Sequence, residues 1–120
     1  MAGVVNTVSL AAFAIILAAG QLLFKKVGLA LRGKPLGYGL AAVVHEPALY
    51  GALMLYAGAT ILWIWLLSRI PLSRAYPWVC VALAIVSLAS WYLFDERLGP
   101  ALWLGVALIG TGVVVIAAAS

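Results

Sequence analysis

The chain has 120 residues, of which 68% are hydrophobic and 8% are charged, and its formal net charge at pH 7 is +4. Soluble globular domains are roughly 45–50% apolar and about 25% charged, so this composition excludes a water-soluble domain. We expect an all-α membrane protein that forms one domain over residues 1–120, with no room for a separate catalytic or sensory unit.

Four stretches without Asp, Glu, Lys, Arg or His predict four transmembrane helices. Each has close to the ~20 apolar residues with which a helix crosses about 30 Å of hydrocarbon. Residues 1–9 contain no Lys or Arg, so the basic start of a cleaved signal peptide is missing and we expect the first stretch to remain in the mature protein. The predicted helices are residues 4–24, 48–67, 75–94 and 101–119.

The basic residues favour one orientation in the membrane. With four helices, the first and third loops share a side, and they carry five Lys and Arg residues against two in the second loop. The positive-inside rule therefore predicts that the first and third loops are cytoplasmic and that both termini lie outside, with an inverted or dual topology as the alternative. These residues are Lys25, Lys26, Arg32 and Lys34 in the first loop, Arg69 and Arg74 in the second, and Arg97 in the third.

The first loop is the longest. Its residues 35–44 are apolar but too few to span a bilayer, so we expect an interfacial or re-entrant segment. His45, Glu46 and Pro47 follow and are typical of a helix start, because proline is tolerated in the first turn and an acid suits the helix dipole there. A functional role for His45 or Glu46 is the alternative.

The other two loops are short, over residues 68–74 and 95–100. Loops of this length make consecutive helices antiparallel neighbours, which predicts an antiparallel four-helix bundle. A bundle this small encloses little volume. The passage of a sizeable substrate would therefore need a second subunit or a groove that is open to lipid.

A polar stripe follows one face of the first predicted helix. Ala14, Ala18, Gln21 and Lys25 have the helical spacing i, i+4, i+7 and i+11. The stripe could line a cavity in which Gln21 binds a head group and Lys25 binds a phosphate. Alternatively, the alanines let helices approach, Gln21 bonds a neighbouring helix, and Lys25 extends to the interface.

The second and third predicted helices carry aromatic and hydroxyl side chains at helical spacing. These side chains could form an amphiphilic lining, or they could anchor the helix ends at the membrane surface, and we favour anchoring for most of the tryptophans. Tyr76 is the exception, because it also belongs to the motif described below. The stripes are Tyr56, Thr60 and Trp63 in one helix and Tyr76, Cys80, Ala84, Ser87 and Trp91 in the other.

Two arginines, Arg69 and Arg74, bracket the turn at Pro71. A guanidinium group recognises phosphate through paired hydrogen bonds, more specifically than an ammonium group does. Arg69 and Arg74 are therefore candidate phosphate ligands, and the alternative is that they mark the membrane boundary.

In the fourth predicted helix, small residues recur on one face, with Gly105 and Gly112 two turns apart. Glycines at this spacing let backbones pack closely, which fits packing within the bundle or dimerisation. The full set of packing candidates is Gly105, Leu108, Ile109, Gly112 and Val113.

Enzyme chemistry has little support. The sequence has no metal-ligand cluster, no Gly-rich phosphate loop and no nucleophilic triad. The neighbouring acids Asp95 and Glu96 would point about 100° apart in a helix, so they would make a poor acid–base pair. We expect no enzyme activity, no metal and no cofactor. Cys80 is the only cysteine and is interpreted as a packing residue. The few basic residues fit anionic lipid head groups and not nucleic acid.

Taken together, these motifs resemble the drug/metabolite transporter superfamily, in the small four-helix (EamA-like) branch that includes the small multidrug resistance transporters. The strongest likeness is to the small subunits of the aminoarabinose-phosphoundecaprenol flippase, which are associated with lipid A modification. The resembling positions are Gly20, Gln21 and Lys25; Ile70, Pro71, Ala75, Tyr76 and Pro77; Glu96; and Gly105, Leu108, Ile109, Gly112 and Val113.

One departure from that family bears on mechanism. Proton-coupled small multidrug transporters carry a glutamate inside the first helix, whereas the corresponding neighbourhood here is Leu17 and Ala18. Without a buried carboxylate, neither a proton nor a cationic drug has a charge partner at mid-membrane. Drug/proton antiport by that mechanism is therefore disfavoured.

The resemblance implies a subunit that moves a polyprenyl-phosphate-linked sugar, or a related anionic glycolipid, across a bacterial inner membrane. The head group would pass Gln21, Tyr56 and Tyr76, with the phosphate held by Arg69, Arg74 or Lys25. Glu96 would recognise an amino group on the sugar, or else mark the start of the fourth helix. The expected partners are membrane lipids and a second small membrane protein, in a homodimer or a heterodimer. The alternatives are a small-molecule or drug exporter and a non-transporting accessory subunit.

Overall fold

The computed structural model describes residues 2–119, and the regular structure in this range is entirely helical. Four helices are long and apolar enough to cross a membrane, and a short helix lies between the first two of them. The predicted fold class is therefore confirmed. The long helices are α1 (Ala2–Leu31), α3 (Pro47–Leu67), α5 (Trp78–Leu93) and α6 (Pro100–Ala119), and the short ones are α2 (Leu36–Val44) and α4 (Leu72–Ala75). The third candidate span, Leu72–Leu93, consists of α4 and α5 together.

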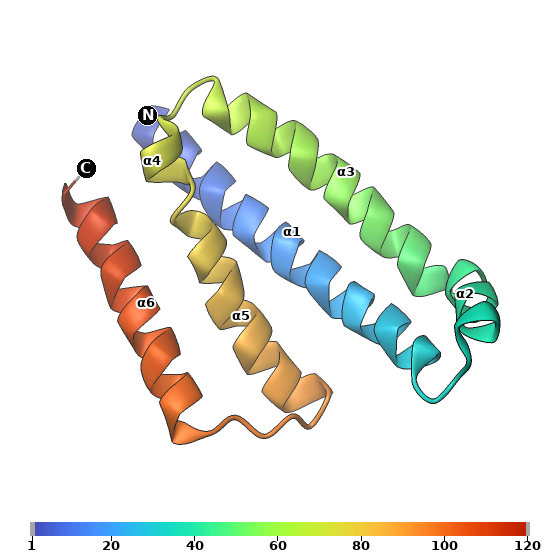
Figure 1. Ribbon diagram of the computed structural model, residues 1–120. Helices are drawn as coiled ribbons and strands as arrows, with labels where there is room; N and C mark the ends of the chain where they lie inside the picture. The colour runs from blue at the N-terminus through green and yellow to red at the C-terminus, as the bar shows by residue number, and fades with distance from the viewer. Residues whose placement is uncertain (1, 120) are drawn as a thin grey trace.

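The long helices lie in the order α3, α1, α5, α6 (Figure 1). Both chain ends and α4 lie at one end of the molecule, and α2 and the loop between α5 and α6 lie at the other. The molecule extends 49 × 35 × 19 Å. The four helices form a flattened, open antiparallel bundle, in which α3 packs mainly on α1, and α6 on α5.

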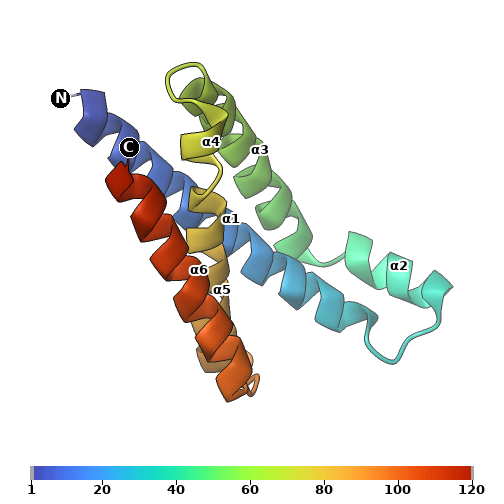
Figure 2. The ribbon, with the colours of Figure 1, turned by 60° about the vertical axis from the view of Figure 1, so that its left-hand side comes forward.

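The neighbour relations differ from the expectation drawn from loop length. Consecutive long helices do alternate in direction, but α3 and α5 diverge from their shared turn and pack mainly against opposite sides of α1 (Figure 1). Helix α6 packs against α5, and none of its described side chains is buried. Figure 2 shows that α6 lies on the side of α5 away from α3, while α2 projects beyond the end of α1.

Helix α1 is longer than predicted. It continues for seven residues past Phe24, through Lys25 and Lys26, because nothing before Gly33 breaks the helix. Gly33 ends the segment with a φ of +73°, a conformation that glycine adopts easily. A 30-residue helix is about 45 Å long, so its last turns extend past the ~30 Å hydrocarbon layer and place both lysines at its edge.

The predicted interfacial segment is helix α2. It packs on the C-terminal part of α1, where a Cβ atom on Gly39 would come within 2.6 Å of Leu31 Cδ2. The Tyr50 hydroxyl donates a hydrogen bond of 2.7 Å to the Val44 carbonyl, which ties the end of α2 to α3. Helix α3 starts with Pro47 in its first turn, after Glu46, as predicted from the sequence.

The third predicted helix is not continuous. Helix α4 ends at Ala75 and α5 begins at Trp78, with Pro77 between them. The backbone bonds from Val79 to Tyr76 and from Cys80 to Pro77 are three residues apart, which is the tighter 3₁₀ pattern. Proline donates no backbone hydrogen bond, and the break places Tyr76 between the two helices.

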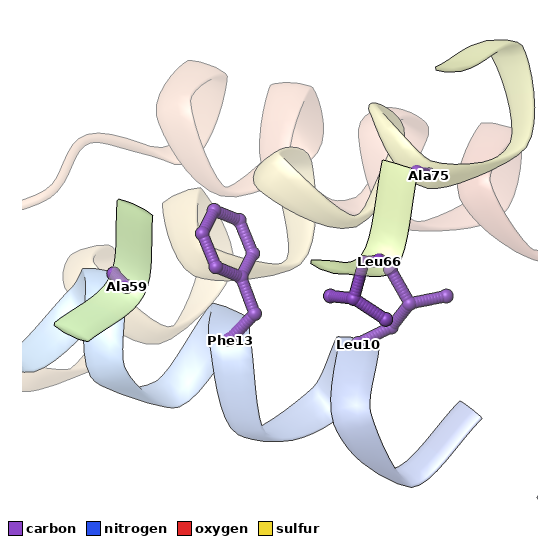
Figure 3. Close-up of a cluster of buried hydrophobic side chains, with 5 residues drawn as sticks. All are labelled: Leu10, Phe13, Ala59, Leu66 and Ala75. Atoms are coloured by element: carbon purple, nitrogen blue, oxygen red, sulfur yellow. The ribbon is translucent and has the colours of Figure 1, made fainter. Parts of the chain in front are cut away.

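The core is small and rich in alanine. Figure 3 shows one cluster in which Leu10 and Phe13 of α1 meet Ala59 and Leu66 of α3 and Ala75 of α4. A second cluster joins Ala14 and Ala18 to Ala82 of α5. Small side chains let helices approach closely in lipid, where close packing replaces the hydrophobic effect as the main attraction.

Candidate functional site

A groove runs between α3 and α5, with one face of α1 as its floor. It contains two adjoining cavities of about 210 and 330 Å³, which share Leu17, Tyr56 and Val79. We call it the α3–α5 groove. It exists because α3 and α5 diverge on either side of α1. Its lining includes exposed side chains such as Tyr56, Thr60 and Leu83, so it is open to the surroundings of the helices.

The floor of the groove is Phe13, Leu17 and Gln21, and Lys25 follows on the same helical face. Of the two interpretations of the stripe, the cavity lining applies to Gln21. Ala14 and Ala18, which are 0% and 1% exposed, pack against Ala82 of α5, as the alternative of helix packing predicted. The alanine side of α1 therefore serves helix packing, and the adjacent side faces the groove.

The α3 wall is the predicted stripe of Tyr56, Thr60 and Trp63. Trp63 stacks on Phe13 with 4.7 Å between ring centroids and meets the Tyr76 ring edge-on at 6.3 Å. These contacts hold Trp63 in the groove lining. The Thr60 hydroxyl donates to the Tyr56 carbonyl within its own helix at 2.8 Å.

The α5 wall differs from the stripe considered in the sequence analysis. The lining residues after Tyr76 are Val79, Ala82, Leu83 and Val86. Ser87 is buried, and its hydroxyl donates to the Leu83 carbonyl at 2.9 Å. The groove-facing side of α5 is therefore apolar, and Tyr76 is the polar residue that α4 and α5 contribute to the groove.

Two polar contacts stand at the α2 end of the groove. Gln21 Nε2 donates to the Tyr56 hydroxyl oxygen at 3.3 Å, and the Tyr56 ring lies 5.5 Å from the Phe24 ring. One turn further along α1, Lys25 Nζ lies 3.1 Å from Glu96 Oε1. The side chains of this pair remain 44% and 39% exposed, so both charges are accessible to a ligand.

The loop conformation after α5 brings Glu96 to Lys25. Asp95 has a φ of +53°, a left-handed conformation that aspartate tolerates better than most side chains. Glu96 lies four residues before the first residue of α6. It therefore does not mark the start of that helix, and its carboxylate ties the α5–α6 loop to α1 instead.

The two arginines lie at the opposite end of the molecule. Arg69 and Arg74 line a separate cavity of about 320 Å³, which we call the terminal pocket because both chain ends lie beside it. Arg69 also stacks over the Trp65 ring at 4.8 Å. The predicted site residues thus form two groups, with Gln21, Tyr56, Lys25 and Glu96 at one end, Arg69 and Arg74 at the other, and Tyr76 between them. The lining of the terminal pocket is Gly3, Asn6, Thr7, Leu10, Arg69, Ile70, Pro71, Arg74, Trp78 and Ala117.

Sequence reasoning missed Asn6, which lines the terminal pocket. Asn6 continues the stripe of Leu10, Phe13, Leu17 and Gln21 at spacings of four, three, four and four residues, which keeps them on one helical face. That periodicity was the available signal. It was hidden because Asn6 lies within a stretch that was recognised only by its lack of charge.

The two glycines of this face are not packed against another helix, because a Cβ atom placed on Gly105 or on Gly112 would meet no atom of another described element within 4 Å. Leu108 is 65% exposed. Packing within the protomer therefore does not account for these three residues. Within residues 2–119, no group of three His, Cys, Asp or Glu side chains could hold a metal ion.

The comparison with curated proteins identifies distant relatives. The chain is 36% identical over 69 residues to proteins from Salmonella paratyphi B, Salmonella newport and Salmonella typhimurium, each named "Probable 4-amino-4-deoxy-L-arabinose-phosphoundecaprenol flippase subunit ArnE". The match covers 58% of this chain and 62% of each relative, so the chain spans less than two thirds of the relatives' length. No family model and no solved structure matches the chain. The resemblance seen in the sequence is thus confirmed as distant homology to this flippase subunit.

Proposed function

We propose that this chain is one subunit of a transporter that moves a polyprenyl-phosphate-linked sugar, or a related anionic glycolipid, between the leaflets of a bacterial cytoplasmic membrane. The observation that carries the proposal is the α3–α5 groove, which is open along its side and has an exposed Lys25–Glu96 pair at one end. The names of the distant relatives support a transporter subunit. The cargo is taken from the names of these relatives, and the open groove and the exposed charge pair suit it.

The shape of the groove suits a substrate with a lipid tail. Because α3 and α5 diverge, a polyprenyl chain can stay in the bilayer while the head group moves along the floor of the groove. The middle of the groove offers the hydroxyl groups of Tyr56, Thr60 and Tyr76 among apolar side chains. These groups can hydrogen-bond a sugar, while the apolar lining excludes free ions.

The Lys25–Glu96 pair matches the charges of an amino sugar phosphate. Lys25 would bind the phosphate of such a head group, and Glu96 would bind its ammonium group. An exposed ion pair is worth only about 0–1 kcal/mol, so a ligand that supplies both charges can exchange partners with it at little cost. We infer that the head group enters by this exchange, beside the Gln21–Tyr56 contact.

The orientation follows from the charges. The positive-inside rule assigns the end that carries Lys25, Lys26 and Arg97 to the cytoplasm. The Lys25–Glu96 pair would then receive the head group on the side where lipid-linked sugars are built from soluble precursors. The head group would leave at the end that carries Arg69 and Arg74.

The open array implies a companion subunit. Helix α6 packs on one neighbour, and its glycine face is uncovered. Glycines of this spacing typically receive another helix. We propose that a second small membrane protein, either another copy or a similar chain, packs on Gly105, Leu108, Ile109 and Gly112 and closes the groove into a pathway.

Reconstitution tests the transport step. The chain, alone and together with a companion subunit, is placed in vesicles of amine-free lipids that contain undecaprenyl phosphate-linked aminoarabinose. A membrane-impermeant amine reagent then labels only the head groups in the outer leaflet. Transport brings the inner pool to the reagent, so labelling continues past the outer-leaflet amount.

Three outcomes separate the candidate functions. Continued labelling that is lost in Gln21→Leu and Lys25→Gln, and kept in the matched loop variant Lys34→Gln, supports the proposal. Labelling that stops at the outer-leaflet amount under every condition contradicts it and favours an accessory role. Proton release on addition of a cationic drug, without movement of the lipid, indicates an exporter.

A further inference from the structure

The terminal pocket lies at the end where the transport proposal has the head group leave, and it combines two features. One is a pair of arginines without acidic partners, and the other is a buried hydrogen-bond acceptor without a donor. The pocket lies on the same face of α1 as the floor of the groove, since Asn6 and Leu10 line the pocket and Phe13 and Leu17 line the groove.

The positive charge in the pocket is uncompensated. The three acidic residues of the chain are Glu46, Asp95 and Glu96, and all three lie at the opposite end of the molecule, at the start of α3 or in the α5–α6 loop. Within the described part of the chain, neither Arg69 nor Arg74 forms an ion pair. Both side chains are exposed, so an anion can reach them.

The second feature is the side-chain carbonyl of Asn6. Its Oδ1 atom is buried and accepts no hydrogen bond from any described residue. Thr7 does not serve it, because the Thr7 hydroxyl donates to the Gly3 carbonyl at 2.8 Å. A buried acceptor without a partner is unfavourable, and a ligand that brings a donor removes the penalty.

Together these features specify the ligand. The arginines require an anion with several oxygens, for which phosphate is well suited, and Asn6 requires a hydroxyl or ammonium donor close to that anion. The volume of about 320 Å³ lies at the low end of the roughly 300–1,000 Å³ that small-molecule sites occupy. It suits one sugar with its phosphate and not an oligosaccharide.

We propose that the terminal pocket is a second head-group site, in which Arg69 and Arg74 bind the phosphate of a glycosyl phosphate and Asn6 selects the glycosylated form over the bare phosphate. This inference rests on the proposed function for the source of the ligand. It adds a site at the exit end of the groove and makes Asn6 a specificity-determining residue. A head group that leaves Lys25 and Glu96 is then received at the other end of the same face of α1.

The test measures binding and transport separately. Purified chain in amine-free nanodiscs is titrated with undecaprenyl phosphate, with undecaprenyl phosphate-linked aminoarabinose, and with soluble glucose 1-phosphate, and the bound species are counted by native mass spectrometry. Asn6→Leu is expected to weaken binding of the glycosylated lipid by about threefold to tenfold, the effect of one hydrogen bond, and to leave the bare phosphate unchanged. Arg74→Gln is expected to weaken both lipids, and Lys34→Gln neither. Binding of glucose 1-phosphate that equals binding of the lipids would identify a soluble sugar phosphate as the ligand and overturn the head-group assignment.

Tryptophan emission provides a second readout at the pocket, which distinguishes a local effect from misfolding of a variant. Trp78 lines the pocket, so the glycosylated lipid is expected to change the tryptophan emission of the wild-type chain more than that of Trp78→Phe, in which only the other tryptophans respond. The proposal is overturned if Asn6→Leu weakens both lipids equally or neither, or if the emission change of Trp78→Phe is as large as that of the wild type. Unaltered lipid movement in Asn6→Leu and Arg74→Gln would refute this site while the transport proposal stands. Selective binding with no lipid movement by the wild type would refute transport and leave the site intact.

Discussion

Lys25 and Glu96, the two charged side chains at the entrance of the groove, bind each other at 3.1 Å and remain accessible. A pair this exposed adds little to folding stability, so stability alone does not explain the contact. Its position one turn beyond Gln21 places opposite charges where a head group would enter. At the residue scale, the main question is therefore whether these charges serve the ligand or only hold the loop.

Exchanging the charges of Lys25 and Glu96 distinguishes a role in ligand binding from a role in holding the loop. Lys25→Glu and Glu96→Lys, made singly, should change the melting temperature in detergent by no more than the equivalent of about 1 kcal/mol and should strongly reduce binding of undecaprenyl phosphate-linked aminoarabinose. The double exchange restores the ion pair, and hence the loop, but places each charge on the wrong side for the ligand. Binding that returns fully in the double variant would show that the pair is structural.

A substitution of Tyr56 removes a single polar atom at the same end of the groove. Tyr56→Phe removes the oxygen that accepts the Gln21 hydrogen bond and keeps the ring against Phe24. Because the bond is long and exposed, we expect a loss of stability below about 1 kcal/mol with a measurable fall in lipid transport, followed by amine labelling. Thr111→Val, a hydroxyl removal on α6 away from the groove, is the control. If both variants transport the lipid equally well, the Tyr56 hydroxyl does not contribute to the pathway.

At the element scale, α1 is the central helix, and two of its sides have different roles. One side carries Ala14 and Ala18 against α5, and the adjacent side carries the floor of the groove. Helix α3 packs mainly on α1, and its buried residues include Ala48 and Ala52, at 8% and 0% exposure. We expect these alanines to set the spacing of the helices and with it the width of the groove.

Enlarging one of them tests this account. Ala52→Leu introduces a side chain where none fits, and overpacking of this kind costs typically 1–3 kcal/mol. We expect a lower melting temperature in detergent. The matched variant Ala57→Leu, at an exposed position of the same helix, should be near neutral. If both variants melt alike, the alanine contact does not determine how α1 and α3 pack.

At the scale of the whole molecule, the array is flattened and α6 lies at its edge, with its glycine face uncovered. A Cβ atom at Gly112 would meet no other helix of the described chain within 4 Å, so Gly112→Leu should leave the melting temperature of the isolated protomer unchanged. It should nevertheless weaken association with a companion subunit, as measured by native mass spectrometry. Ala107→Leu, on another face of α6, is the control. If Gly112→Leu does not affect association, the interface lies on another part of the surface.

Particular residues show how far sequence reasoning reached. The alternation of four predicted helices placed the first and third loops on one side, and the Lys25–Glu96 contact agrees with that. The stripe of Tyr56, Thr60 and Trp63 was recognised from its spacing and lines the groove. The rotation of α5 was not predictable, because Cys80, Ala84 and Ser87 have the same periodicity as the lining residues Val79, Leu83 and Val86. In a helix that is apolar all round, periodicity does not say which side faces a neighbour.

The sequence by itself determined that the chain is helical and membrane-embedded and that charge is confined to the helix ends, because lipid requires long uncharged helices whose backbone bonds are internal. Only the tertiary structure decided that α3 and α5 separate across α1, that Glu96 reaches Lys25, and that Asn6 meets Arg69 and Arg74 in one pocket. Those relations depend on which small side chains pack against each other across helices. In lipid, where nearly every residue is apolar, the fit of surfaces and not hydrophobicity decides that choice.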